Sequence, residues 1–340
     1  MIMLSRQESG ILKGVAILIM LFLHLFNREN NVDICMSYFY FRGEPVVFQL
    51  SKFAAICVHL YLFLSGYGLY ITFLKSGNMH NVRRVLSLYV NFWIVFALFI
   101  GLASVLKPTA YPGAVMTFIS NFIGWRTTYN GEWWFLFPYV LLVLSSWKIM
   151  HAIYRMHYVV LFLILGSLYL VSFLLTKMNM DYIYTHRLVY MPILYLNLLF
   201  PFGIGAIFAK EDWFGKFEKQ IKVLKHENLW LILSILFLIF IRILLPVSVF
   251  NPVFAFCFLL LFASLKRPKW FNWFLSKMGE QSTNMWLIHT FFCYYLFRDF
   301  IYGFKYPIII YVVLLTVSYL SARLIDMINK PIQRIINKRL

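Results

Sequence analysis

The chain has 340 residues, of which 62% are apolar, 20% are aromatic and only 13% are charged. Soluble domains carry about 25% charged and about 45–50% apolar residues, so this composition excludes an ordinary soluble protein. The net charge of +18 is explained by basic loops on the cytoplasmic face of a membrane, and we expect no nucleic-acid partner. We therefore predict an all-α integral membrane protein.

A transmembrane helix needs about 20 predominantly apolar residues, and long continuous runs of this kind are not typical of a β-barrel. The connections between the runs are too short for a second domain, so we expect a single bundle and one domain over residues 1–340. We predict ten spans, near residues 11–27, 51–74, 85–106, 131–147, 158–176, 189–209, 229–245, 249–265, 284–302 and 307–326.

The distribution of Lys and Arg among the connections predicts the orientation of the bundle. With a cytoplasmic N-terminus, 21 of the 31 Lys and Arg residues fall on the cytoplasmic side, so we place both termini inside. The first apolar run has the length of a full span and no convincing small-residue cleavage site. We therefore expect it to be the first span and not a signal peptide.

The four cysteines form no CxxC or CxxH pair. Three of them, Cys57, Cys257 and Cys293, fall within predicted spans, where a Cys usually packs as a small hydrophobe. The sequence therefore indicates neither a disulfide framework nor a metal site.

Ionisable residues inside a span are costly, so they usually face the bundle interior and serve a function. The candidates are His24 in the first span, His59 in the second, Glu132 at the start of the fourth and His289 in the ninth. Arg242, Arg298 and Asp299 lie near span ends, where we expect their charged groups to reach the outer interface.

Helical rise places three of these candidates at a similar depth. His24 lies about 16 Å along its helix from Lys13, and His59 lies about 12 Å from the outer end of its own span. Glu132 lies at the outer mouth of the fourth span. We therefore predict that these three groups converge in the outer half of a core about 30 Å thick. His289, about 8 Å from the cytoplasmic side, need not belong to this cluster.

A His and a carboxylate are suited to proton transfer, because the imidazole is a good general base and the carboxylate orients it. The same pair would serve a proton-coupled transporter, and the residues alone do not separate the two. Plainer interpretations remain open. An intramembrane His can hydrogen-bond a neighbouring helix, Glu132 can be a helix-start carboxylate, and Trp133 and Trp134 can belong to an interfacial aromatic belt.

A second cluster is predicted at the cytoplasmic ends of the spans. The segment "KSGNMHNVRR" (75–84) carries Lys75, Arg83 and Arg84, and Lys13 opens the first span. The positive-inside rule explains such residues. Alternatively, they bind a phosphate-rich ligand, to which Arg supplies forked donors.

Four segments, in order along the chain, resemble the acyltransferase-3 family of bacterial membrane O-acyltransferases. "KGVAILIMLFLHLF" (13–26) is similar to its opening motif, a basic residue followed after ten residues by His. "CVHLYLFLSGYGLY" (57–70) resembles its aromatic second-span signature ending in Ser-Gly-aromatic. "GEQSTNMWLIHTFF" (279–292) resembles its Gly-x-x-Ser segment before a C-terminal His, and "LIDMINKPIQRI" (324–335) resembles its final helix.

This resemblance implies transfer of an acyl group, usually acetyl, from cytoplasmic acyl-coenzyme A to a hydroxyl of a cell-surface glycan or its lipid-linked precursor. It places the protein in the bacterial cytoplasmic membrane, surrounded by lipid. The expected catalytic residues are His24, Glu132 and His59, with His24 as the general base of a single displacement. A covalent acyl-His relay remains an alternative.

We also expect two binding sites. The coenzyme A phosphates are expected at Lys13, Lys75, Arg83 and Arg84. Substrate contacts are expected at Trp133, Trp134 and His289. The chain departs from the family pattern, since Lys13 stands where Arg is common and His80, not Arg, lies three residues before Arg83. A Lys holds a phosphate as a point charge but cannot fork to it.

A different class of protein fits the same residues. An exporter or flippase of a glycan or lipid-linked intermediate would also combine many spans, interior polar groups and abundant aromatic side chains. Release of coenzyme A thiol distinguishes the two, because only an acyltransferase produces it. The sequence predicts neither the acceptor sugar nor the oligomeric state.

Overall fold

The computed structural model describes residues 4–77 and 79–339. Within these residues the chain is all-helical apart from one short two-stranded hairpin. The chain divides into two compact units. Unit 1 comprises Met1–Ala16, Ala55–Asn81 and Pro138–Ser276, and unit 2 comprises Ile17–Ala54, Val82–Phe137 and Lys277–Leu340.

Eight helical stretches of the described chain are long and apolar enough to cross a membrane. They are Arg6–Phe26, Val46–Ser76, Asn81–Leu106, Gly131–Arg155, Tyr158–Met178, Arg187–Glu211, Glu227–Leu244 and Pro307–Ile336. Each overlaps one of the predicted spans, which confirms a multi-pass membrane protein built from helices. The cytoplasmic position of both termini stays a prediction.

The eighth and ninth predicted spans take a different form. The eighth contains α13, Asn251–Ser264, whose 14 residues extend about 21 Å, less than the roughly 30 Å core of a bilayer. The ninth is interrupted, because α14, Lys269–Thr290, leads into a π-helical turn, η3, Phe291–Tyr295, and then into the short α15, Arg298–Tyr302. The total of ten spans therefore also stays a prediction.

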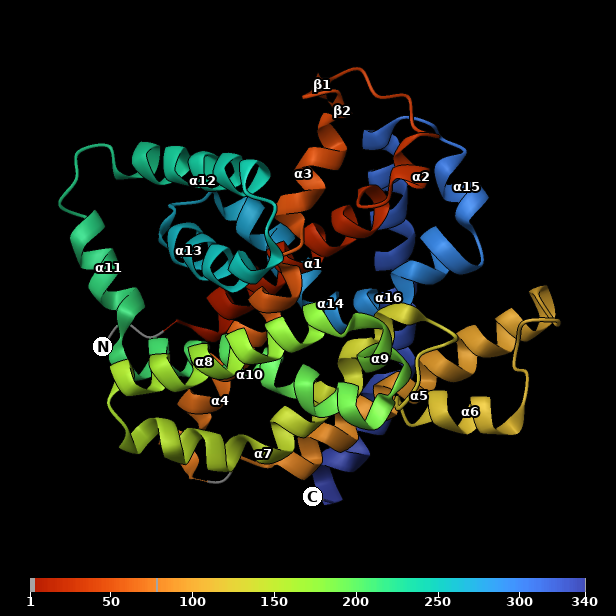
Figure 1. The fold of residues 1–340 in the computed structure, drawn as a ribbon, viewed down its shortest axis with the longest axis horizontal. Helices are drawn as coiled ribbons and strands as arrows, with labels where there is room; N and C mark the ends of the chain where they lie inside the picture. The colour runs from red at the N-terminus through yellow and green to blue at the C-terminus, as the bar shows by residue number, and fades with distance from the viewer. Residues whose placement is uncertain (1–3, 78, 340) are drawn as a thin grey trace. The chain divides into compact units, whose positions relative to one another are not determined.

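Unit 1 is built mainly from helices of the middle of the chain. Helix α10 packs against both α4 and α8, and α12 packs against α13 (Figure 1). The elements that lie wholly in this unit are α4 (Cys57–Ser76), α8 (Tyr158–Met178), α9 (Met180–Thr185), α10 (Arg187–Glu211), α11 (Trp213–Ile221), α12 (Glu227–Leu244), η2 (Ser248–Phe250) and α13.

The contact between α4 and α10 depends on two glycines that leave no room for a side chain. A Cβ at Gly66 would lie 1.8 Å from the Phe202 carbonyl oxygen, and a Cβ at Gly205 would lie 2.0 Å from the Phe63 carbonyl oxygen. Small residues allow this close backbone approach, which is common between helices in membranes. The Ser-Gly-Tyr segment at 65–67 therefore carries a steric constraint.

Arg242, which we expected at the outer interface, is instead buried between α12 and α13, with only 3% of the residue exposed. Its Nε and Nη2 donate to Asn251 Oδ1 at 3.1 and 2.8 Å, and its Nη1 donates to the Leu245 carbonyl oxygen at 3.2 Å. The expectation was wrong because the short connection brings a buried acceptor, Asn251, to the end of α12.

Unit 2 combines the end of α1 with the C-terminal helices. The elements wholly within it are α2 (Glu29–Val32), β1 (Tyr40–Phe41), β2 (Glu44–Pro45), α3 (Val46–Ala54), α6 (Val115–Phe122), η1 (Gly131–Phe135), η3, α15 and α16 (Pro307–Arg339). Helices with residues in both units are α1 (Arg6–Phe26), α5 (Asn81–Leu106), α7 (Leu136–Arg155) and α14. Strands β1 and β2 pair antiparallel across Arg42 and Gly43, whose positive φ values of 55° and 79° suit a type I′ turn.

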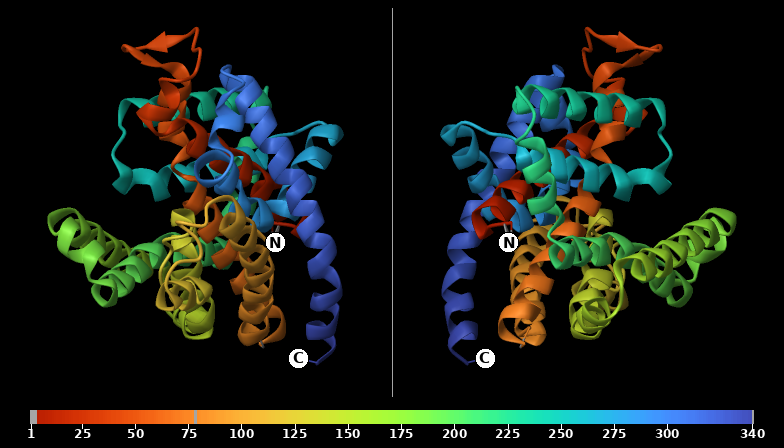
Figure 2. Two further views of the ribbon diagram at one scale, coloured as in Figure 1. Left: turned by 90° about the vertical axis from the view of Figure 1, so that its right-hand side faces the viewer. Right: turned by 90° about the vertical axis from the view of Figure 1, so that its left-hand side faces the viewer.

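Side-chain amides join α16 to α5 and α14 within unit 2. Asn329 Nδ2 donates to Asn91 Oδ1 at 2.8 Å, and Asn91 Nδ2 donates to Asn284 Oδ1 at 2.6 Å. Gln333 Nε2 donates to the Ser87 carbonyl oxygen at 3.0 Å, where α16 runs beside α5 (Figure 2). Buried amides need partners, so this chain of hydrogen bonds fixes the rotation of the three helices about their axes.

The close approach of α4 and α10 generates a stability prediction. Gly66→Ala places a methyl group against the α10 backbone, and overpacking of this kind destabilises by about 1–3 kcal/mol. Gly68→Ala, two residues along the same helix, is the matched control, because a Cβ there meets no atom within 4 Å. Thermal unfolding of the purified proteins in detergent should show a lower midpoint for Gly66→Ala only; equal midpoints would contradict the steric account.

Candidate active site

His24 lies in the last turn of α1 and is 8% exposed. The last carbonyl groups of a helix have no partners within it, and here tyrosine hydroxyls supply donors. Tyr294 donates to the His24 carbonyl oxygen, and Tyr302 donates to the Leu25 carbonyl oxygen at 2.9 Å. The end of α1, and with it the imidazole of His24, is therefore held by two hydroxyl groups.

Glu132 faces this imidazole, with its Oε2 3.6 Å from Nε2 of His24. At this distance the two atoms form no hydrogen bond, but in the tautomer with hydrogen on Nε2 this hydrogen faces the carboxylate and Nδ1 carries the lone pair. The Tyr294 hydroxyl lies 3.5 Å from Nδ1, but its single hydrogen is donated to the His24 carbonyl oxygen. In that tautomer the Nδ1 lone pair is available to accept a proton.

Turn η1 positions Glu132, and Asn130 begins this turn. Asn130 has an extended backbone, and its Oδ1 accepts a hydrogen bond from the Glu132 N–H at 3.1 Å, the usual role of Asn before a helical turn. Thr290 Oγ1 donates to the same oxygen at 3.0 Å. The end of α14 and the start of η1 are thereby tied together by one amide oxygen.

Two indole groups strengthen this attachment. Trp133 Nε1 donates to the Leu287 carbonyl oxygen at 2.9 Å, and Trp286 Nε1 donates to the Glu132 carbonyl oxygen at 3.2 Å. Trp133 is fully buried, and its ring centroid lies 4.9 Å from that of Phe92. The ring is enclosed and its N–H is paired, so Trp133 packs within the cluster. Its contact with the substrate stays a prediction.

The π-helical turn η3 directs two tyrosines to the same region. Tyr295 Oη accepts a hydrogen bond from the Gly131 N–H at 2.8 Å, while Tyr294 reaches α1. Lys107 Nζ donates to the Tyr295 carbonyl oxygen at 2.6 Å. A π-helical turn changes the direction of the side chains that follow a helix and is frequent at functional sites.

His289 joins the cluster from α14. It is fully buried, and its ring centroid lies 5.0 Å from that of His24. Its Nδ1 lies 3.0 Å from the Met285 carbonyl oxygen and 2.9 Å from the Trp286 carbonyl oxygen. Since carbonyl oxygens only accept, Nδ1 carries the hydrogen and Nε2 the lone pair of the neutral ring. Among the described residues, Nε2 has no hydrogen-bond partner.

Arg28 contributes the positive charge of the site. Its Nη2 lies 3.9 Å from Glu132 Oε1, and its guanidinium carbon lies 4.1 Å from the centre of the Tyr294 ring. The Arg28 side chain is 55% exposed while that of Glu132 is 17% exposed. The Glu132 carboxylate therefore lies between the guanidinium of Arg28 and the imidazole of His24.

The remaining predicted site residues belong to α1, α4, α5 and η1. His59 and Lys75 lie on α4, and Lys13 lies on α1, all in unit 1. Arg83 and Arg84 lie in the first turn of α5, in unit 2, and Trp134 lies half-buried in η1. The predicted basic cluster is therefore divided between the units. Asn78, within its segment 75–84, lies outside the described residues.

Among the described residues, no group of three His, Cys, Asp or Glu side chains is arranged to hold a metal ion. Within the same part of the chain, the four cysteines form no disulfide.

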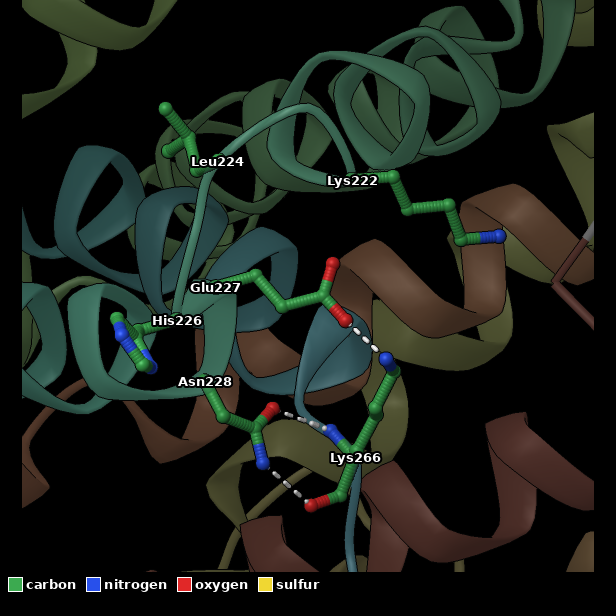
Figure 3. Close-up of a pocket in the computed structure, with 6 residues that line it drawn as sticks. All are labelled: Lys222, Leu224, His226, Glu227, Asn228 and Lys266. Carbon is green, nitrogen blue, oxygen red and sulfur yellow. Dashed lines mark hydrogen bonds and ion pairs between the residues drawn. The ribbon is translucent and has the colours of Figure 1, made fainter.

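Unit 1 also has an open hollow of about 610 Å³ (Figure 3). The Glu227 carboxylate pairs there with the Lys266 ammonium. Asn228 Nδ2 donates to the Lys266 carbonyl oxygen at 2.9 Å, and Asn228 Oδ1 accepts from the Lys266 N–H at 2.9 Å. The polar groups of Glu227, Asn228 and Lys266 pair with one another, and these contacts join α12 to the segment after α13. We therefore take the cluster around His24, and not this hollow, as the candidate active site.

A family model for the acyltransferase domain of the acyltransferase-3 family matches residues 8–326, nearly the whole chain. The chain therefore belongs to this family of membrane acyltransferases. No curated protein and no solved structure shows a significant match.

Sequence reasoning missed Asn130, Arg28 and Tyr294 as members of the cluster. Asn130 precedes a Gly-Glu pair and an aromatic run, which is a recognisable helix-start signal. Arg28 and Tyr294 carried no such signal, because their role depends on which elements meet in unit 2.

The two neighbouring tryptophans of η1 generate a matched prediction. Trp133→Ala removes a buried ring and a hydrogen bond and should destabilise the protein by about 3–5 kcal/mol. Trp134→Ala removes a half-buried ring and should cost about 1 kcal/mol or less. Detergent thermal unfolding of both variants checks the difference, and a larger loss for Trp134→Ala would contradict the packing role of Trp133.

Proposed function

We propose that this acyltransferase moves an acetyl group from cytoplasmic acetyl-coenzyme A to a hydroxyl of a cell-surface polysaccharide or its lipid-linked precursor, in the bacterial cytoplasmic membrane. Family membership supports acyl transfer as the reaction class. The observation that carries the catalytic assignment is the buried contact of 3.6 Å between His24 Nε2 and Glu132 Oε2. A carboxylate that orients an imidazole is a recurrent arrangement for general base catalysis.

The reaction is a single displacement. His24 Nδ1 takes the proton of the acceptor hydroxyl as its oxygen attacks the thioester carbonyl carbon, and the carbonyl electron pair moves onto the carbonyl oxygen. When that pair returns, the carbon–sulfur bond breaks and the coenzyme A thiolate takes the proton from the His24 imidazolium. Glu132 stabilises the imidazolium, and the products are an acetyl ester and free coenzyme A.

The donor and the acceptor approach this centre through different residues. We assign the coenzyme A phosphates to the cytoplasmic basic residues Lys13, Lys75, Arg83 and Arg84, since phosphate binds cationic side chains. We assign sugar stacking to the half-buried Trp134, and an auxiliary catalytic role to His59. For His289, the unpartnered Nε2 beside His24 supports a substrate hydrogen bond, because a buried lone pair needs a donor.

The base assignment predicts that His24→Ala loses acetyl transfer by about 10²–10⁴-fold, the usual contribution of a general base. The measurement is release of coenzyme A thiol from acetyl-coenzyme A by membranes that contain the acceptor, normalised to the amount of folded protein. Glu132→Gln keeps the shape of the side chain and should give an intermediate loss. Thiol release by His24→Ala at the wild-type rate would overturn the assignment, and no release by wild type would favour an exporter.

The fixed tautomer of His289 predicts opposite behaviour of two substitutions. His289→Asn keeps a donor near the position of Nδ1, and His289→Gln keeps an amide near the position of Nε2. If Nε2 receives a substrate hydrogen bond, Gln should retain several-fold more activity than Asn, and Asn should raise KM for the acceptor. If the ring serves only to bond the α14 backbone, Asn should retain more activity than Gln.

A further inference from the structure

The amide nitrogen of Asn130 is a second buried polar atom of the cluster without a partner. Asn130 is 0% exposed, and within the described residues its Nδ2 has no hydrogen-bond partner. An amide nitrogen carries two hydrogens to donate, and buried polar groups are paired in the large majority of cases. An unpaired donor of this kind inside a reaction centre needs an explanation.

The direction of this amide is fixed by the groups around its oxygen. Asn130 Oδ1 accepts from both the Glu132 N–H at 3.1 Å and Thr290 Oγ1 at 3.0 Å. A flipped amide would set its own N–H groups against the backbone N–H of Glu132, so the network assigns oxygen and nitrogen unambiguously. The two amide hydrogens are thus held in place before any substrate binds.

Through its hydrogen-bond partners, the Asn130 side chain is linked to residues that neighbour both histidines of the cluster. Asn130 is two residues from Glu132, which faces His24 at 3.6 Å, and its partner Thr290 follows His289 directly in α14. The cluster therefore combines two acceptors, Nδ1 of His24 and Nε2 of His289, with one fixed donor group. The acceptors suit the hydroxyl hydrogen of an incoming sugar, whereas the donor suits an oxygen that gains negative charge.

Resting on the proposed function, we propose that Asn130 is a catalytic residue whose Nδ2 hydrogens bind the carbonyl oxygen of the acyl-coenzyme A thioester. As the acceptor oxygen adds to the carbonyl carbon, the electron pair of the C=O bond moves to this oxygen, and the amide stabilises the negative charge. When the pair returns and the thiolate leaves, the contact weakens again. A preorganised donor acts mainly in the transition state, because it needs no reorientation as charge develops.

The test compares variants that keep the turn but lose the donor. Asn130→Asp preserves an oxygen for the Glu132 N–H and Thr290, and Asn130→Ser preserves a good residue for the start of a helical turn. Both remove the amide hydrogens. We expect kcat for thiol release to fall by about 10²–10³-fold, the usual effect of losing one such donor, with little change in KM for acetyl-coenzyme A.

Asn121 provides the matched control, because it is an equally buried Asn of unit 2 whose amide is fully used. Its Nδ2 donates to the Thr117 carbonyl oxygen and to Thr128 Oγ1, both at 2.8 Å, and its Oδ1 accepts from the Tyr129 N–H at 3.1 Å. Asn121→Asp should lower the unfolding temperature but leave kcat per folded molecule unchanged. Asn130→Asp should lower kcat per folded molecule but leave the unfolding temperature unchanged.

The outcomes separate this inference from the proposed function. If wild type releases thiol and His24→Ala does not, while both Asn130 variants keep kcat within about threefold of wild type, the oxyanion role is wrong and Asn130 only begins the turn. If wild type releases no thiol from acetyl-coenzyme A, the proposed function itself fails. A selective loss of kcat in both folded Asn130 variants supports the inference.

Discussion

The attachment of turn η1 to α14 is the constraint on which the candidate active site depends. Donors on each element pair with oxygen atoms on the other, through the indoles of Trp133 and Trp286 and the hydroxyl of Thr290. In a low-dielectric interior such hydrogen bonds are strong and an unmade one is costly. Glu132 is therefore presented by a rigid turn, which is what a carboxylate that orients an imidazole requires.

The partner of that carboxylate is fixed by a different means. His24 lies in the last turn of α1, where the carbonyl groups have no partner within the helix. Hydroxyl groups from η3 and α15 donate hydrogen bonds to two of these carbonyl oxygens. The helix end and the site are thus stabilised by the same tyrosines. Nε2 of His289 and Nδ2 of Asn130 are two of the buried polar atoms that have no hydrogen-bond partner among the described residues. Departures from polar satisfaction are expected where a ligand completes the network.

Unit 1 obeys a different constraint, since its helices α4 and α10 meet through backbone contacts at Gly66 and Gly205. The Ser-Gly-aromatic segment was recognisable in the sequence, but its purpose was not, because a glycine reveals nothing of what lies opposite. For Arg242, the charge and the position near the end of a span predicted a side chain at the membrane interface. The structure instead buries it, because Asn251 on α13 accepts two of its hydrogen bonds. The atoms that a residue meets in the folded chain decide such cases, whether they lie far along the chain, as Phe202 does from Gly66, or on the next helix, as Asn251 does from Arg242.

By itself, the sequence determined the helical membrane architecture and the family and made His24 a candidate, because long apolar runs and intramembrane ionisable groups are costly features with few uses. It also allowed His24 and Glu132 to be paired by depth. Only the tertiary structure brought His289 beside them, fixed the tautomer of His289 and showed that the amide nitrogen of Asn130 is buried without a partner among the described residues. Depth along a helix follows from counting residues, whereas the direction of a side chain and its hydrogen-bond partner depend on how helices rotate and pack.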